Sequence, residues 1–140
     1  MAKIDLQLDL LVVCDQAFVS KENKLSLIGI FDQIFTDKLP FNYLKLAIVA
    51  VIRGEPNGNY SVRLEIKDPS GKTTPSPEFK FTLGSNGKTN LISEFGNLPL
   101  PLDGIYKVSL FVGKKAIGQT GFTVARTSAP SSVPGSNIVN

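Results

Sequence analysis

The chain has 140 residues, 42% of them hydrophobic, so it is long enough to bury one core without disulfides or metal. It contains no His and a single Cys, which excludes Ser–His and Cys–His catalysis and removes the commonest zinc ligand. The net charge of +3 is far from the clustered basic excess of a strong nucleic-acid binder. We therefore expect one small domain that is not an enzyme and that uses no cofactor and no metal.

The chain opens with an alternating segment from Ile4 to Cys14, in which aliphatic residues occupy the even positions and Asp or Gln the first odd ones. This period of two predicts a strand with one solvated face. After a bulge or bend at Asp15-Gln16 the strand resumes, and a polar turn follows over Ser20 to Lys24. Leu25 to Phe35 is the predicted returning strand of a hairpin, and Gly29 within it indicates a bulge or a close backbone approach.

Two alternating segments follow a break at Pro40. Leu44 to Ile52 carries apolar residues on its even positions, and so does Tyr60 to Lys67. A turn that contains Gly and Pro separates them, so we predict that they pair as a second hairpin. Asp68 to Gly71 has the residue order of a type I turn.

The remaining predicted strands are shorter or bounded by proline. A strand from Phe79 to Leu83 is separated by a Gly-containing turn from a weaker one over Thr89 to Phe95. Leu98 to Leu102 contains two prolines, which cannot donate to a ladder, so it belongs at a sheet edge or outside the sheet. Ile105 to Val112 and Ala116 to Val124 complete the pattern.

No segment shows the apolar spacing of an amphipathic helix over three turns. Short strands with hairpin-length connections predict an all-β fold, a two-sheet antiparallel sandwich over residues 1–124. A small closed β-barrel is the alternative, because counting strands does not distinguish the two. Over residues 125–140, Ser, Pro and Gly replace the large apolar residues, which predicts a flexible tail.

The core is expected on the inward faces of the strands. We predict that the following side chains are buried: Phe31, Leu46, Ile48, Val62, Leu64, Phe81, Tyr106, Val108, Leu110 and Phe122. We predict that Lys45, Arg63, Glu65 and Lys67 are exposed. Cys14 lies on the apolar face of the opening strand, which indicates a buried small hydrophobe rather than a reactive thiolate.

The closing strands resemble the last two strands of immunoglobulin-like domains. The similarity lies in Asp103-Gly104-Ile105-Tyr106-Lys107-Val108, Phe111 to Lys115 and Gly121 to Val124. The resemblance implies that the Tyr106 hydroxyl ties the corner before the penultimate strand. It does not extend to the antibody disulfide, because position 108 is Val and the chain has no Trp.

A larger part of the chain, from about Leu11 to Val124, resembles an uncharacterised family of small bacterial proteins classed as a domain of unknown function. The matching segments are Cys14 to Ala17, Leu25 to Asp32, Asp68 to Gly71 and Gly104 to Tyr106. The resemblance implies an immunoglobulin-like β-sandwich and brings no activity, cofactor or catalytic residue with it.

Two segments are candidate interfaces. Ala47, Val49 and Val51 form an apolar row on the nominally solvated face of their strand, and such a row usually has a cover. That cover is either the opening strand of the same chain or a second subunit. Ile138 and Val139 lie beyond the predicted flexible stretch, where they either stay solvated or add a strand to a neighbour's open edge.

Lys45, Arg53, Arg63 and Lys67 form a candidate basic patch along the predicted Tyr43 to Lys67 hairpin. A nucleic-acid surface also needs exposed aromatic side chains for base stacking, and only Tyr43 is available there. We therefore expect a solvated basic face rather than a nucleic-acid site.

These patterns favour a non-enzymatic protein-interaction or structural module whose partner is a protein, with self-association as one form of that contact. The alternative is a ligand-binding β domain for nucleic acid or a small polar molecule, which a concave pocket with converging polar groups would favour. Charged residues interrupt the opening apolar stretch before it reaches the length of a signal sequence or membrane span. We therefore expect a cytoplasmic protein with no membrane contact.

Overall fold

The computed structural model describes residues 5–127. Within that range the chain forms ten β-strands and no helix, which confirms the all-β prediction. The strands are β1 (Gln7–Val19), β2 (Leu25–Ile30), β3 (Gln33–Thr36), β4 (Phe41–Arg53), β5 (Asn59–Lys67), β6 (Thr73–Pro75), β7 (Phe79–Thr82), β8 (Lys88–Leu100), β9 (Gly104–Val112) and β10 (Lys115–Arg126).

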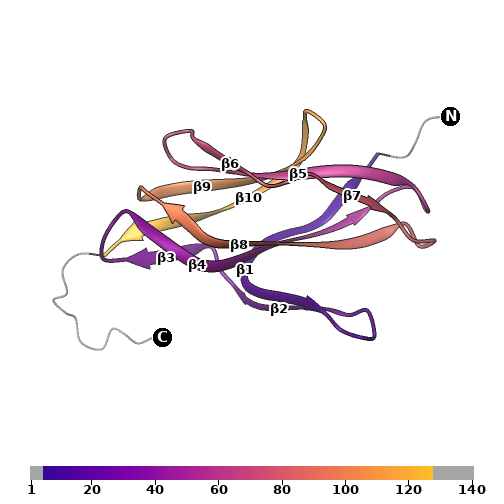
Figure 1. Cartoon of the computed structure of the whole chain (residues 1–140), viewed down its shortest axis with the longest axis horizontal. Coiled ribbons are helices and arrows are strands. Elements are labelled where there is room, and N and C mark those ends of the chain that lie inside the picture. Colours follow the sequence, from indigo (N-terminus) through magenta and orange to yellow (C-terminus); the bar gives the residue numbers. More distant parts are fainter. Residues whose placement is uncertain (1–4, 128–140) are drawn as a thin grey trace.

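The strands form two sheets that pack face to face (Figure 1). Sheet A has the order β2-β1-β4-β8, and sheet B has the order β3-β10-β9-β5-β6, with β7 also paired to β5. Over the described residues neither sheet closes on itself, because β2 and β8 end sheet A while β3 and β6 end sheet B. The predicted sandwich is confirmed, and the closed barrel is wrong.

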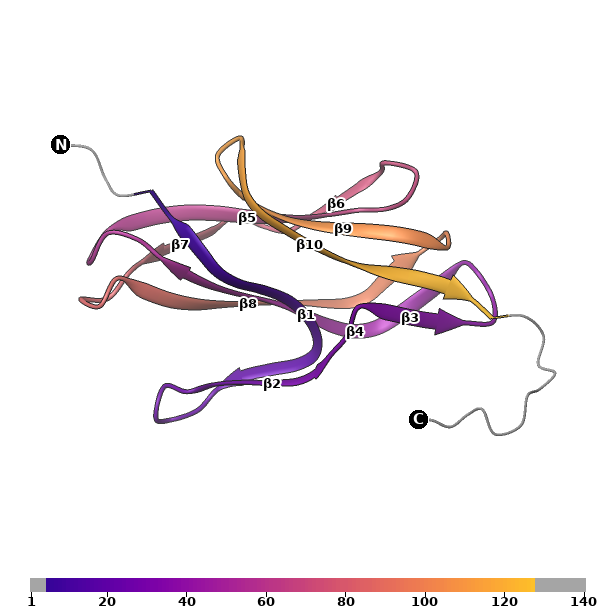
Figure 2. The ribbon, with the colours of Figure 1, turned by 180° about the vertical axis from the view of Figure 1, so that it is seen from behind.

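The predicted pairing of Leu44–Ile52 with Tyr60–Lys67 is wrong. β4 pairs with β1 and β8 in sheet A, whereas β5 pairs with β9 in sheet B. The connection between β4 and β5 therefore passes from one sheet to the other (Figure 2). The physical reason is that alternation specifies which face of a strand is apolar but not which strand lies beside it.

The core lies between the sheets, and β5 shows the predicted register with Val62, Leu64 and Ile66 buried. The buried members of the predicted core are Leu46, Ile48, Val62, Leu64, Tyr106, Val108, Leu110 and Phe122. Phe31 and Phe81 are only half-buried, since Phe31 lies in the link after β2 and Phe81 lines an open pocket. Lys45 and Lys67 are exposed as predicted, whereas Arg63 and Glu65 are half-buried because they form an ion pair.

β4 changes phase near its start. Leu44 was expected on the core face with Leu46, but its side chain is 79% exposed, while Tyr43 packs against the core instead. The strand opposite contains Gly96, the pairing partner of Lys45, and Asn97, whose φ of 50° lies in the left-handed region. This local departure from extended geometry breaks the regular alternation.

β1 and β2 form the predicted opening hairpin, in which Val19 pairs with Leu25. Its turn is closed by the Ser20 N–H, which donates to the Lys24 carbonyl at 2.9 Å. The predicted return strand ends at Ile30, and its remainder, β3, crosses to sheet B and pairs in parallel with β10. In the β1–β4 pairing the register shifts between Leu8 and Leu10. The irregularity predicted at Asp15-Gln16 is present as well, because Cys14 and Ala17 pack in the same buried cluster, whereas a regular strand would place them on opposite faces.

Tyr106 ties the corner before β9, as the resemblance to immunoglobulin-like domains implied. Its hydroxyl donates to the Leu102 carbonyl at 2.6 Å and accepts the Leu102 N–H at 3.1 Å. The ring stacks on Phe122 with centroids 5.2 Å apart. Because β1, β4 and β8 face β10, β9 and β5, the strand arrangement is also that of an immunoglobulin-like sandwich.

The proline-containing segment around Pro99 is part of β8, an edge strand of sheet A, which agrees with the expectation for proline. The turn at Asp68 is closed by the Gly71 N–H, which donates to the Asp68 carbonyl at 2.9 Å. β10 continues two residues past the predicted domain end at 124, because Ala125 and Arg126 pair with β3.

Candidate functional site

The outer face of sheet A is covered by the chain's own opening hairpin. Ala47 and Val49 are fully buried in a small cluster with Cys14, against which Ala17, Leu25 and Leu27 pack. Of the two covers that the sequence left open, the structure therefore shows the internal one for Ala47 and Val49. Val51 is half-buried. Ile138 and Val139 lie outside the described residues, so their interface role remains a prediction.

Cys14 is buried at the centre of this cluster, as predicted. Its thiol donates to the Gln16 carbonyl at 3.3 Å. Burial raises the pKa of the Cys14 thiol, and the negative charge of Asp15 acts in the same direction. The side chain is therefore a packing element and not a nucleophile.

The base of the hairpin is held by Asp15. The Tyr43 hydroxyl donates to Asp15 Oδ1 at 2.9 Å, which ties β1 to β4. Gly29 of β2 has a φ of 71°, and a Cβ at that position would lie 2.5 Å from Asp15 Oδ2. Glycine is favoured at this position because the backbone is left-handed and because the Asp15 side chain lies close to where a Cβ would be, in line with the irregularity that the sequence indicated. These contacts fix how the hairpin leaves the sandwich.

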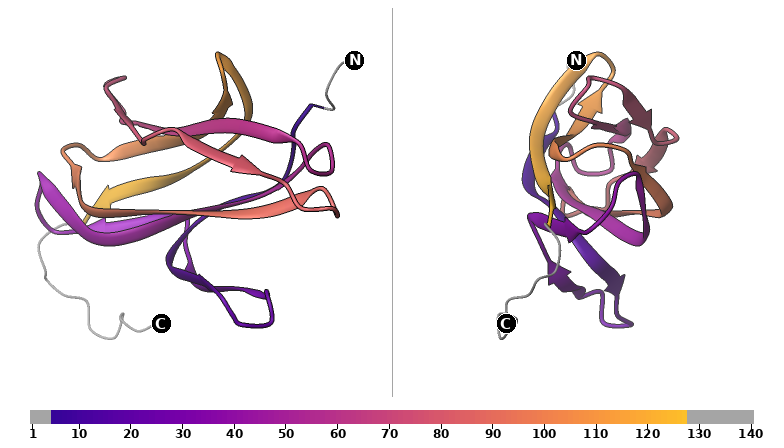
Figure 3. Two further views of the ribbon diagram at one scale, coloured as in Figure 1. Left: turned by 45° about the vertical axis from the view of Figure 1, so that its right-hand side comes forward. Right: turned by 90° about the vertical axis from the view of Figure 1, so that its left-hand side faces the viewer.

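The opposite face of the hairpin carries large apolar side chains in solvent. Gln16 pairs with Ile28 and Phe18 with Ser26, so Phe18 and Ile28 share one face, which we call the free face. Ile30 lies beyond the left-handed Gly29 and pairs with Cys14 of the buried cluster, so it is not part of this face. The side chains of Phe18 and Ile28 are 49% and 51% exposed. Both views in Figure 3 show the hairpin standing clear of the two packed sheets. Two large apolar side chains exposed on one face indicate a contact surface.

Sequence reasoning missed this free face, although a signal was present. The segment Leu25–Ile30 is apolar at both odd and even positions. A strand that buries one face needs apolar residues only at its odd positions or only at its even positions. The odd residues Leu25 and Leu27 cover Ala47 and Val49, and Ile28 is left exposed on the other face.

The four residues of the predicted basic patch do not form one surface. Lys45 and Arg53 lie on β4 in sheet A, whereas Arg63 and Lys67 lie on the outer face of β5 in sheet B. Three of them contact carboxylates: Lys45 lies 3.6 Å from Glu94, Arg53 lies 2.8 Å from Asp9, and Arg63 pairs with Glu65. The basic stripe is therefore divided between two opposite faces, and the expectation that it lies along one hairpin is wrong.

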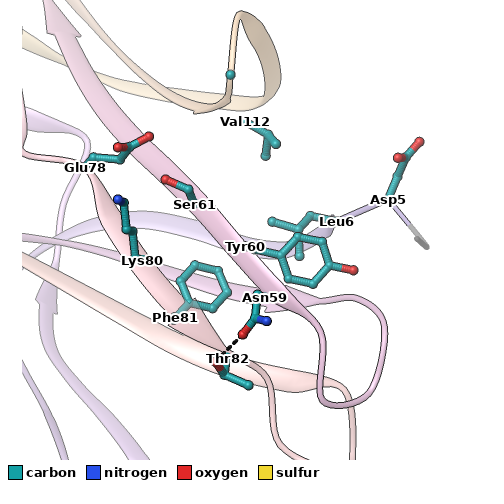
Figure 4. Close-up of a pocket in the computed structure, with 11 residues that line it drawn as sticks. Asp5, Leu6, Asn59, Tyr60, Ser61, Glu78, Lys80, Phe81, Thr82 and Val112 are labelled. Carbon is teal, nitrogen blue, oxygen red and sulfur yellow. Dashed lines mark hydrogen bonds between the residues drawn. The ribbon is translucent and has the colours of Figure 1, made fainter. Parts of the chain in front are cut away.

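A pocket of about 790 Å³ opens between the start of β1, the β5–β7 pair and the β9–β10 turn (Figure 4). Its apolar part includes Leu6, Val112 and the rings of Tyr60 and Phe81, whose centroids lie 6.2 Å apart. This is the kind of concave site that the ligand-binding alternative required.

Polar groups surround the pocket. Glu78 and Lys80 of the β7 segment lie on one side, and Asp5 lies at the other (Figure 4). The Ser61 hydroxyl is buried, with no hydrogen-bond partner among the described residues. The pocket therefore combines aromatic surface with charges of both signs.

Within residues 5–127 no group of His, Cys, Asp and Glu side chains is arranged to hold a metal ion. The same range contains no helix that is long and apolar enough to cross a membrane.

The fold and the tyrosine corner define the protein as an immunoglobulin-like β-sandwich. The chain belongs to the family described as "Family of unknown function (DUF6941)", whose model matches residues 9–125. This confirms the resemblance to an uncharacterised family. None of the curated proteins matches the chain.

Several solved structures are similar to the chain at low sequence identity. The alkylpurine DNA glycosylase AlkC of Pseudomonas fluorescens, bound to DNA with an abasic site analogue, is similar over 86% of this chain and 30% of its own, with 12% identity and a TM-score of 0.58. A Bifidobacterium adolescentis GH3 β-glucosidase is similar over 93% of this chain and 19% of its own, with 9% identity and a TM-score of 0.54. An immunoglobulin-like protein from Pseudomonas aeruginosa is similar over 86% and 96%, with 16% identity and a TM-score of 0.46.

The chain thus spans less than a third of the glycosylase and of the β-glucosidase. At these identities the likeness concerns the sandwich fold alone, because one fold carries many unrelated functions.

Proposed function

We propose that the protein is a non-enzymatic, cytoplasmic protein-interaction module, and that it contacts its partner through the β1–β2 hairpin. The observation that carries this proposal is the free face, where Phe18 and Ile28 are each about half exposed on an element that projects from the sandwich. Burying such side chains against a partner gains about 25 cal/mol per Å² of apolar surface removed from water.

The hairpin also offers backbone groups. β2 ends sheet A and has a strand neighbour on one side only. A partner strand placed beside β2 gains main-chain hydrogen bonds, while the free face supplies apolar contacts to its side chains. The other face of the hairpin is fixed to the sandwich through Leu25 and Leu27, so the surface is presented on a supported element.

The experiment places a photo-crosslinking amino acid at Gln16 of the full chain in cells. Gln16 is exposed and pairs with Ile28, so the probe lies beside the free face and leaves its apolar side chains intact. We expect a covalent adduct of discrete mass, and we expect Phe18→Ser to abolish it. A probe at Gln119, which is exposed on sheet B, is the matched control. Equal labelling from Gln16 and Gln119, or no adduct from Gln16, would contradict the proposal.

A second candidate function, binding of a small polar molecule, is favoured by the pocket beside Tyr60 and Phe81. Its aromatic rings offer surfaces on which a flat ligand can stack, and Glu78 and Lys80 can pair with positively and negatively charged ligand groups. Titration of the labelled protein with amino acids and monosaccharides tests it by NMR. Saturable shifts at Ser61, Glu78 and Phe81 support this function, and shifts that grow without saturation exclude it for these ligand classes.

A further inference from the structure

We infer that the pocket beside Tyr60 and Phe81 binds a free α-amino acid with an apolar side chain. The inference rests on the second candidate function and names its ligand class. In this arrangement Glu78 accepts hydrogen bonds from the ammonium group of the ligand, and Lys80 and Ser61 donate to its carboxylate. The apolar wall of the pocket covers the ligand's side chain.

The pocket exists because β5 begins before its pairing with β9 does. β5 starts at Asn59, but its register with β9 starts at Arg63, which pairs with Phe111. The residues of β5 before Arg63 pair with β7 on one side. On the other side Val112, at the end of β9, lies across the pocket from Ser61 (Figure 4). A ligand therefore has access to a part of β5 that is not covered by β9.

Two side chains of opposite charge lie at one side of the pocket. Glu78 and Lys80 are both exposed, and no ion pair among residues 5–127 involves either of them. Residues two apart along an extended chain point to the same side and lie about 6.8 Å apart. Two charge-assisted hydrogen bonds of about 2.8 Å each therefore reach the ammonium and the carboxylate of one α-carbon. A ligand with charge of one sign only meets a like charge at one of the two residues.

The Ser61 hydroxyl is a second donor for the carboxylate. Ser61 pairs with Lys80 across the strands, so the two side chains are neighbours on one face. Figure 4 shows the hydroxyl directed toward the side where Glu78 and Lys80 lie. It is buried and has no hydrogen-bond partner among the described residues, which costs free energy. A carboxylate bound between Ser61 and Lys80 removes this cost.

The remaining wall of the pocket is apolar and is held in place. Leu6 and Val112 line it together with two aromatic rings. The Tyr60 hydroxyl accepts the Glu55 N–H at 2.8 Å, so the orientation of this ring is fixed and its polar end is already bonded. An aliphatic or aromatic side chain packs well on such a surface. A polar side chain would lose its hydrogen bonds to water there.

The test is an NMR titration of the full chain with L-phenylalanine up to about 10 mM, a range that covers weak binding. We expect saturable shifts at Ser61, Lys80 and Phe81. Phenethylamine lacks the carboxylate and 3-phenylpropionate lacks the ammonium group, so each should bind at least about tenfold more weakly. L-Serine keeps both charges but has no apolar side chain, and it should also bind more weakly than L-phenylalanine.

Variants assign the two charged groups. Lys80→Met and Glu78→Gln are each expected to weaken L-phenylalanine binding at least about tenfold. Lys80→Met should leave phenethylamine binding unchanged, because this ligand has no carboxylate. Lys67→Met is the matched control, since Lys67 is an exposed lysine at the other end of β5 and does not line this pocket. Unchanged melting temperatures verify that the charge variants fold.

Ser61→Ala has opposite effects on two measurements. It should weaken the binding of L-phenylalanine, because one donor to the carboxylate is lost. It should leave the melting temperature of the free protein unchanged or higher, because it removes a buried hydroxyl that has no partner.

Equal binding of L-phenylalanine, phenethylamine and 3-phenylpropionate overturns the inference, as does L-phenylalanine binding that Lys80→Met leaves unchanged. The absence of saturable L-phenylalanine binding overturns it as well. If glucose then gives saturable shifts at Ser61 and Phe81, the second candidate function stands and only the ligand class is wrong.

Discussion

Tyr106 is the residue whose role the sequence and the structure describe most fully. Its hydroxyl both donates to and accepts from the backbone of Leu102, in a corner that is otherwise buried against Phe122. Tyr106→Phe removes both hydrogen bonds and leaves backbone groups of Leu102 without a partner. We expect a loss of about 1–3 kcal/mol in the free energy of unfolding, measured by urea denaturation. A change below about 0.5 kcal/mol would show that the corner is held by packing alone.

Tyr43 makes the stability of the hairpin base depend on pH. Burial, and then the hydrogen bond to Asp15, raise the pKa of Tyr43 from 10.0 to about 12. The folded protein holds the phenolic proton more tightly than the unfolded chain, so this contribution is complete below pH 10 and is lost as the pH rises toward 12.

Tyr43→Phe therefore removes a contribution to the free energy of unfolding that depends on pH. We expect the variant to be less stable than the wild type at pH 8, with the difference between them shrinking as the pH rises toward 12. Denaturation curves over this range measure that difference. The comparison cancels Tyr106, whose pKa is also raised by burial and which is present in both proteins. A difference in the free energy of unfolding between wild type and Tyr43→Phe that stays constant as the pH rises toward 12 would contradict the raised pKa of Tyr43.

The opening hairpin is the element that divides most clearly into two roles. Its inner face covers Ala47 and Val49, and its free face carries Phe18 and Ile28. The inner face is structural, because removing the cover would expose a fully buried apolar row.

Val49→Lys tests the inner face. A Lys at this position lies under the hairpin without a charged partner in the cluster, so we expect a loss of at least about 2 kcal/mol in the free energy of unfolding. Leu44→Lys, on the same strand but exposed, should change stability by less than about 0.5 kcal/mol. Thermal or urea denaturation of the two variants measures both. Equal small effects would mean that the hairpin does not cover Val49 in solution.

Sequence reasoning predicted single elements well and their neighbours poorly. The alternation of Tyr60–Lys67 placed Val62 and Leu64 in the core, and the turn residues Asp68–Gly71 marked a real turn. The pairing of β4 with β5 was wrong because long-range strand partners depend on the packing of the whole sandwich. The free face escaped prediction because sequence reasoning places large apolar residues in the core. In this hairpin only one of the two apolar faces packs against the sandwich, and the other is exposed.

At the scale of the whole molecule, the sandwich acts as a support for one projecting element. Two open sheets enclose a core that runs from Leu46 on β4 to Phe122 on β10. β2 is an edge strand of sheet A, and its hairpin carries the free face. The partner contact is therefore proposed to lie on this hairpin.

Photo-crosslinking from Gln16 and from Gln119 of the full chain in cells tests this claim most directly. We predict an adduct of discrete mass from Gln16, which Phe18→Ser abolishes, and none from Gln119, because Gln16 pairs with Ile28 on the hairpin whereas Gln119 lies on sheet B. Equal labelling from the two positions, or no adduct from Gln16, would contradict the account.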